Sequence, residues 1–215
     1  MAWPIDFSKQ VFHGKTIYRI LFNDQVKKHC ALLSGRVIDL AGGSKSSYYP
    51  YLPAGLEITK TNYFAGEGID QVVNLDQVLP FADDSFDAAL LFNAIYIMAE
   101  PAKTLAEIKR ILKPGGKLYL ASPFIANEMP EPHDYCRFTA EGLEQLLAQA
   151  GFSEVKVERF GERFSSAAYL LHLLFGFNLA RFLAYSAALF LDKMIPTKLA
   201  KNYPTPLGYF CVVKK

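Results

Sequence analysis

Three residues of one short segment carry side chains that could do acid–base chemistry: His133, Asp134 and Arg137. Histidine titrates near neutral pH, so His133 could act as a general base towards a hydroxyl group. Asp134 could orient the imidazole, and Arg137 could hold an anionic group of a substrate. A structural interpretation stays open beside this one, in which Asp134 pairs with Arg137 and docks the loop onto the rest of the protein. These three residues are the candidate catalytic residues.

A second stretch, residues 37–43, is an apolar run that ends in two adjacent glycines, Gly42 and Gly43. Glycines directly after a buried strand allow a sharp turn and let a bulky ligand approach the main chain. We therefore expect both glycines to face a ligand. Asp39 lies inside the run, where it either contacts a cofactor or is a buried acid held by backbone N–H groups of the turn.

The elements that must position these residues alternate along the chain. Helical spacing of apolar residues predicts a helix over residues 16–33, and Pro101 and Thr139 are typical first residues or caps of two more helices. The first strand runs from Arg36 into the glycine turn, and six more are predicted at residues 56–62, 69–75, 86–92, 117–121, 153–159 and 208–213. This alternation indicates a doubly wound α/β sheet, whose strands end at a ligand crevice.

Composition limits the classes of function. The chain has 215 residues, 51% of them hydrophobic and 20% charged, which is typical of one ordered domain. Its net charge of +2 argues against a nucleic-acid partner. The three cysteines, Cys30, Cys136 and Cys211, are scattered, so we expect reduced thiols and no metal site. The N-terminal segment lacks the pattern of a signal peptide, so we expect a cytoplasmic protein. Association with a membrane surface stays open beside this expectation.

One segment interrupts the alternation of strands and helices. Residues 165–198 lie before the last strand, and residues 165–195 are nearly all apolar, but the run is too short to span a bilayer. Three interpretations stay open: a helical pair that covers the sheet edge and closes the pocket, a lid that binds a lipid-like acceptor, and a surface for a peripheral membrane contact or a homodimer. We expect this insert and a lead-in at residues 1–35 to belong to one domain, residues 1–215.

Four motifs in order carry a resemblance to a known family. They are VIDLAGG (37–43), LPFADDSFD (79–87), AEIKRILKPGG (106–116) and PHDYCRFT (132–139). The ordered set resembles the class I S-adenosylmethionine-dependent methyltransferases, of the methyltransferase type 11 kind. This resemblance implies a Rossmann-like methyltransferase fold, a seven-stranded mixed sheet with an antiparallel last strand, here with an apolar helical insert before that strand. It also implies S-adenosylmethionine as the cofactor.

The resemblance also assigns residues to the cofactor site, although some depart from the family pattern. Ala41 and Lys45 stand where the family has glycine, and Asn62 stands where an acid grips both ribose hydroxyls. The candidate cofactor-binding residues are Asp39, Ala41, Gly42, Gly43, Asn62, Asn74, Asp76 and Asn93.

The resemblance, together with the departures of this sequence from the family's cofactor motif, leads to two hypotheses for the function. The first is an S-adenosylmethionine-dependent methyltransferase that acts on a small or lipid-linked acceptor, with oxygen as the expected methylated atom and His133 as the base. The second is a non-catalytic binding or scaffold protein of the same fold, whose cofactor site has decayed. A nicotinamide-dependent dehydrogenase is disfavoured because the GxGxxG turn is absent.

Overall fold

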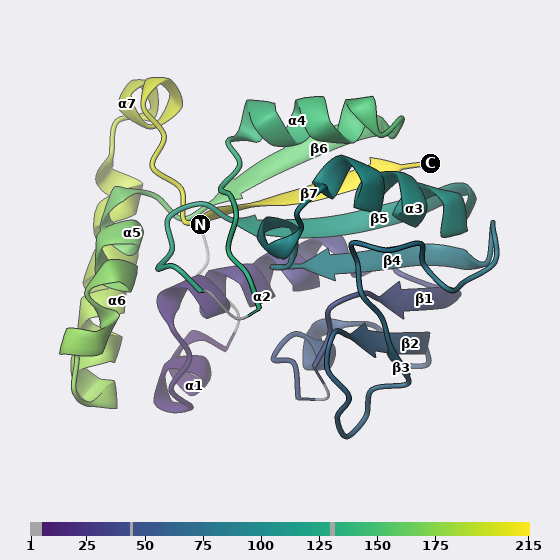
Figure 1. Cartoon of the computed structure of the whole chain (residues 1–215). Coiled ribbons are helices and arrows are strands. Elements are labelled where there is room, and N and C mark those ends of the chain that lie inside the picture. Colours follow the sequence, from purple (N-terminus) through teal and green to yellow (C-terminus); the bar gives the residue numbers. More distant parts are fainter. Residues whose placement is uncertain (1–5, 44, 130–131) are drawn as a thin grey trace.

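The computed structural model of the chain describes residues 6–43, 45–129 and 132–215. Seven strands form one sheet in the order β3-β2-β1-β4-β5-β7-β6, with helices on both faces (Figure 1). The strands are β1 (Arg36–Asp39), β2 (Glu57–Asn62), β3 (Gln71–Val72), β4 (Phe86–Phe92), β5 (Leu112–Pro123), β6 (Ser153–Phe160) and β7 (Gly208–Lys214). The doubly wound, mixed sheet predicted from the sequence is therefore confirmed.

The strand directions determine at which edge of the sheet the crevice lies. β1 pairs in parallel with β2 and β4, and β4 pairs in parallel with β5. β7 is antiparallel to both β5 and β6, as the resemblance implied. β4 is buried along almost its whole length, which explains why residues 86–92 are apolar on both faces. The carboxyl ends of β1, β2 and β4 consequently meet at the same edge.

The helices divide between two apolar cores on the two faces of the sheet. α1, α2, α5 and α6 pack on one face, while α3 and α4 pack on the other. Thr139 caps α4 as predicted, because its hydroxyl accepts a hydrogen bond from the N–H of Gly142. The helices are α1 (Phe7–Phe12), α2 (Ile17–His29), α3 (Pro101–Ile111), α4 (Ala140–Gln149), α5 (Arg163–Leu170), α6 (Asn178–Met194) and α7 (Thr197–Asn202), with short 3₁₀ turns η1 (Tyr49–Tyr51), η2 (Ile95–Ile97) and η3 (His172–Leu174).

Two elements differ from the sequence prediction. The strand predicted over residues 69–75 is only β3, because the chain then turns at Asn74, whose side chain accepts a hydrogen bond from the N–H of Asp76. The strand predicted over residues 117–121 begins earlier, because β5 starts at Leu112 and includes the Lys-Pro-Gly-Gly segment, residues 113–116. Its Gly115 has φ +78°, and the pairing of β4 with β5 shifts register there.

The apolar insert forms α5, η3, α6 and α7 between β6 and β7. α5 packs against α6 and α2, and α6 also packs against α1. Asp192 of α6 accepts hydrogen bonds from the N–H groups of Phe164 (2.8 Å) and Ser165 (3.1 Å), which fixes the start of α5 against α6. Among the helices of the described residues, none combines the length and the apolar character needed to cross a membrane.

Candidate active site

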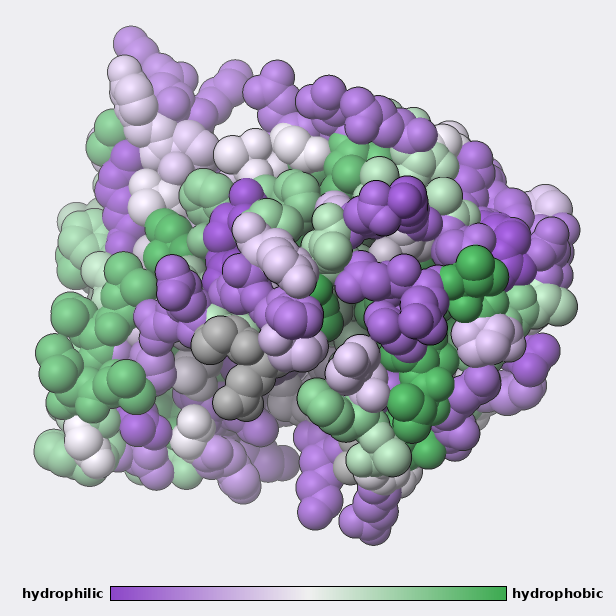
Figure 2. Space-filling model, viewed as in Figure 1, coloured by the Kyte–Doolittle hydropathy of each residue, from purple (hydrophilic) through white to green (hydrophobic). Residues whose placement is uncertain are grey.

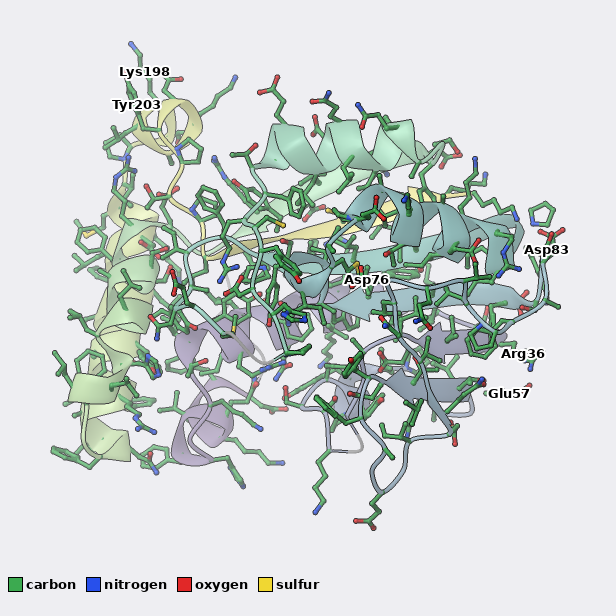
Figure 3. The ribbon with its side chains drawn as sticks, viewed as in Figure 1. Arg36, Glu57, Asp76, Asp83, Lys198 and Tyr203 are labelled. Carbon is green, nitrogen blue, oxygen red and sulfur yellow. The ribbon has the colours of Figure 1, made fainter. Side chains whose placement is uncertain are left out.

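A cavity of about 270 Å³ opens at the carboxyl ends of β1, β2, β3 and β4. Asp76, which is labelled in Figure 3, lines this cavity. Six of the predicted site residues line this cavity: Ala41, Asn62, Asn74, Asp76, Asn93 and His133. The other five do not belong to its lining: Asp39, Gly42, Gly43, Asp134 and Arg137. The topology thus brings together polar residues that are up to 71 positions apart in the sequence, from Asn62 to His133.

Asp39 is a buried acid held by two tyrosines. Its Oδ2 accepts hydrogen bonds from the hydroxyls of Tyr48 (2.6 Å) and Tyr49 (2.8 Å). Burial raises the pKa of the Asp39 carboxyl from 3.8 to about 6, although both tyrosine hydrogen bonds oppose the shift. The structure thus favours the interpretation of Asp39 as a buried acid, but its main partners are tyrosine hydroxyls and not only backbone N–H groups.

The two glycines of the turn have different surroundings. A Cβ on Gly42 would lie 2.3 Å from Oδ2 of Asp39 and 2.5 Å from the hydroxyl oxygen of Tyr49. A side chain at Gly42 would therefore overlap with these groups, which is a structural reason for glycine at this position, and its contact with a ligand stays a prediction. A Cβ on Gly43 would meet Oγ of Ser46 at 3.7 Å, an ordinary contact.

Local hydrogen bonds fix the polar rim of the crevice. The side chain of Asn62 donates to the carbonyl of Gly42 (3.3 Å) and accepts from the N–H of Phe64 (3.2 Å). Asp76 accepts through Oδ1 from the N–H of Ala99 (3.0 Å). These bonds join the turn after β1 to the end of β2, and they tie the segment after β3 to the one before α3. The rim is therefore held in place by the chain itself.

The loop that carries His133 is braced by an ion pair. Nη2 of Arg137 lies 2.6 Å from Oδ2 of Asp134, and its Nη1 bonds the other carboxylate oxygen. Asp134 also accepts from the N–H of Met129 (2.8 Å), and Arg137 holds the pKa of Asp134 below its usual range. The carboxylate thus bonds Arg137 and Met129, in the structural arrangement that the sequence left open, while the exposed His133 stacks on Tyr135 at 5.2 Å.

The same loop docks onto η2. The guanidinium of Arg137 lies over the ring of Tyr96, 5.0 Å from its centroid, and the N–H of Tyr135 donates to the carbonyl of Tyr96 (2.9 Å). These contacts hold the loop so that His133 lies at the crevice. Asp134 and Arg137 therefore position the loop, and His133 alone of the predicted catalytic residues reaches the cavity.

A second cavity, of about 280 Å³, adjoins the first and shares Ala41, Asn93 and Tyr96 with it. Its lining is rich in aromatic rings and comes from α2, η2, the insert and the strand ends. The lining residues are Thr16, Tyr18, Arg19, Ala41, Ser46, Tyr48, Phe92, Asn93, Tyr96, Pro123, Ala126, Met129 and Tyr169.

Asn93 stands between the two cavities directly after β4. Its φ of 54° lies in the left-handed region, which asparagine tolerates better than most residues. Its Oδ1 accepts a hydrogen bond from the hydroxyl of Tyr18, and its N–H donates to the carbonyl of Ala121 (2.8 Å). Burial raises the pKa of Tyr18, so this hydroxyl stays protonated and keeps donating. Asn93 is thus fixed from α2 and from β5.

Sequence reasoning missed Tyr18, Arg19 and Tyr169 as cavity residues. Tyr18 and Arg19 lie on the helix of the N-terminal lead-in, and Tyr169 lies in the apolar insert. The available signal was weak: a polar-tipped tyrosine inside an apolar helix indicates a partner for its hydroxyl, but not where that partner lies.

The strand order, the antiparallel last strand and the crevice at the strand ends define a Rossmann-like methyltransferase fold. A sequence profile described as "Methyltransferase domain" matches residues 51–120. Residues 51–120 thus match the profile of a methyltransferase domain, and the fold is that of S-adenosylmethionine-dependent methyltransferases, which supports the resemblance seen in the sequence.

Individual relatives agree with this assignment. A demethylmenaquinone methyltransferase of Renibacterium salmoninarum is 39% identical over 95 residues, which are 40% of this chain and 40% of that protein. An O-methyltransferase of Aspergillus nomiae is 28% identical over 153 residues, 66% of this chain and 61% of that protein. A methyltransferase structure from Archaeoglobus fulgidus has a TM-score of 0.62 at 17% identity, over 96% of this chain and 97% of that one. The chain thus matches less than two thirds of the length of these two curated relatives.

Proposed function

We propose that this chain binds S-adenosylmethionine in the crevice and transfers its methyl group to a small or lipid-like acceptor in the second cavity. The observation that carries the proposal is the contact of the two cavities at Ala41, Asn93 and Tyr96. Methyl transfer needs an acceptor in line with the sulfonium methyl, and a second cavity beside the cofactor crevice leaves room for one.

The crevice has the chemistry that the adenosyl part of the cofactor requires. Its wall after β3 and in η2 is apolar, with Val73, Leu75 and Ile97, which suits an adenine ring. Asn62 and Asp76 stand at its rim, where ribose hydroxyls and an adenine amino group need polar partners. The bound cofactor supplies an electrophilic methyl group on a positively charged sulfur.

The second cavity favours a flat, hydroxylated acceptor. The rings of Tyr18, Tyr96 and Tyr169 line it, and Arg19 adds a positive charge that suits an oxyanion. Two relatives carry the names demethylmenaquinone methyltransferase and O-methyltransferase, which supports an aromatic acceptor with oxygen substituents. We assign oxygen as the methylated atom. His133 is the proposed base; it lines the cofactor crevice and not the second cavity, so it would take the proton of an acceptor hydroxyl that extends into the crevice.

Cofactor binding is the first test. Wild-type protein should bind S-adenosylmethionine in calorimetry, and Asp76→Asn should weaken that binding by about tenfold, because one charge-assisted hydrogen bond is lost while the bond to Ala99 is kept. Glu67→Gln is the matched control, since Glu67 is an exposed loop acid outside the cavity lining. Absence of binding at about 1 mM cofactor would refute the proposal.

The transfer itself is tested with methyl-labelled cofactor and two probes, a demethylmenaquinol in detergent and a simple catechol. Label in an ether product supports methylation at oxygen, and label on the ring carbon would replace that assignment. Cofactor binding without transfer to either probe would favour the non-catalytic alternative. The open crevice argues against that alternative, because the tyrosines beside Asp39 leave a cavity of about 270 Å³ unfilled.

A further inference from the structure

The helical insert presents an exposed apolar surface that we call the insert face. On α6, Leu179, Leu183, Phe190 and Met194 recur at helical spacing and are 53–65% exposed. Figure 2 shows hydrophobic residues gathered along the edge of the molecule that Figure 1 assigns to α5 and α6. The insert face consists of Phe164, Leu170, Leu171, Leu173, Leu174, Phe177, Leu179, Leu183, Phe190, Leu191, Met194 and Leu199.

The apolar character of the insert face is not explained by packing within the described chain. The opposite side of α6 already packs into the core through Tyr185, Ala188 and Leu189. α6 is therefore apolar on two sides, and only one of them is covered by the rest of the described chain. Contiguous exposed apolar surfaces of this kind mark binding sites for proteins or membranes.

The charges around the insert face select an anionic partner. Residues 163–203 contain five basic residues and one acid, Asp192. The carboxylate of Asp192 is turned towards the start of α5, where it accepts from the N–H groups of Phe164 and Ser165. Lys198, labelled in Figure 3, and Lys201 lie exposed on α7, beside the apolar residues. Apolar side chains flanked by lysine are typical of helices that lie in the interface of an anionic bilayer.

The insert face also continues into the wall of the second cavity. Tyr169 of α5 lines that cavity, and the next two residues, Leu170 and Leu171, are 51% and 48% exposed on the insert face. A hydrophobic tail resting on the face would therefore lie next to the cavity in which a ring could sit.

We propose that the insert face binds the surface of anionic lipid membranes, with α6 lying in the plane of the interface. This surface would bring a membrane-dissolved acceptor to the second cavity. The membrane contact itself does not depend on the proposed methyl transfer, because it is measured without cofactor or acceptor.

The test is sedimentation with vesicles. Wild-type protein should sediment with vesicles of phosphatidylglycerol and phosphatidylcholine in equal parts, and much less with phosphatidylcholine alone. The double variant Lys198→Glu/Lys201→Glu should weaken binding at least 25-fold, about fivefold for each lysine removed. The double variant Leu183→Glu/Phe190→Glu should abolish it. Leu32→Glu is the matched control, since Leu32 is 92% exposed but lies outside the insert, and it should bind like the wild type.

Thermal unfolding of each variant shows whether it is folded, and Leu174→Glu in η3, at a side chain that is 77% exposed, replaces the α6 variant if that one fails. The proposal is overturned if wild-type protein ignores anionic vesicles, or if the insert variants bind as well as Leu32→Glu does. It is also overturned if lipid-free protein is a dimer that Leu183→Glu/Phe190→Glu dissociates, because a second copy would then cover the face.

Discussion

Gly42→Ala is expected to lower the free energy of unfolding by about 3 kcal/mol. The new methyl group would lie 2.3 Å from Oδ2 of Asp39 and 2.5 Å from the hydroxyl of Tyr49. These atoms cannot step aside easily, because the carboxylate is buried and bonded to both Tyr48 and Tyr49. Relief of the overlap would break at least one of those bonds and leave a buried charge with fewer partners. Denaturant unfolding followed by circular dichroism measures the loss.

Gly43→Ala is the matched control for this prediction. Its methyl group would meet Oγ of Ser46 at 3.7 Å, and its φ lies outside the positive range, so the change in unfolding free energy should stay within about 0.5 kcal/mol. Equal losses in the two variants would show that the turn needs glycine for its backbone path. The overlap of the new methyl group with Asp39 and Tyr49 would then not be the cause of the loss in unfolding free energy of Gly42→Ala.

Most of the sheet was predictable from the sequence, because the local pattern of apolar residues indicates a strand. Residues 86–92 are apolar except for Asp87, and the structure forms β4 over those same residues. Thr139 and Pro101 begin helices because capping and a missing N–H are local effects. β3 was overpredicted, since the apolar residues Val73 and Leu75 are buried under α3 and the crevice loops without strand pairing.

The candidate site was predictable only in part, for a similar reason. Parallel strands end at one edge, so Asn62, Asn74 and Asn93 could be expected to meet. The partners of Asp39 could not, because Tyr48 and Tyr49 follow in a polar turn whose path back to β1 no local pattern specifies. The second cavity depends on α2 packing against β4, which is a long-range contact of the same kind.

Asp39→Asn is expected to remove a pH dependence of about 3 kcal/mol from the stability of the protein. Burial raises the pKa of this carboxyl in the folded chain from 3.8 to about 6, so the folded state binds the proton more tightly than the unfolded state does. The resulting stabilisation is complete below about pH 4 and is lost as the pH rises through about 6. Above that range the wild type carries the cost of a buried carboxylate, which the amide of asparagine avoids.

The measurement is the unfolding free energy of wild type minus that of Asp39→Asn, from denaturant titrations between pH 4 and pH 8. The difference should fall by about 2.5 kcal/mol across this range, with its steepest part near pH 5, midway between the two pKa values. Tyr48→Phe removes a hydroxyl that stabilises the carboxylate, so it should raise the pKa of Asp39 further and extend the fall to higher pH. A flat difference would mean that water reaches the carboxylate, and the cluster of Asp39, Tyr48 and Tyr49 would then not be closed in solution.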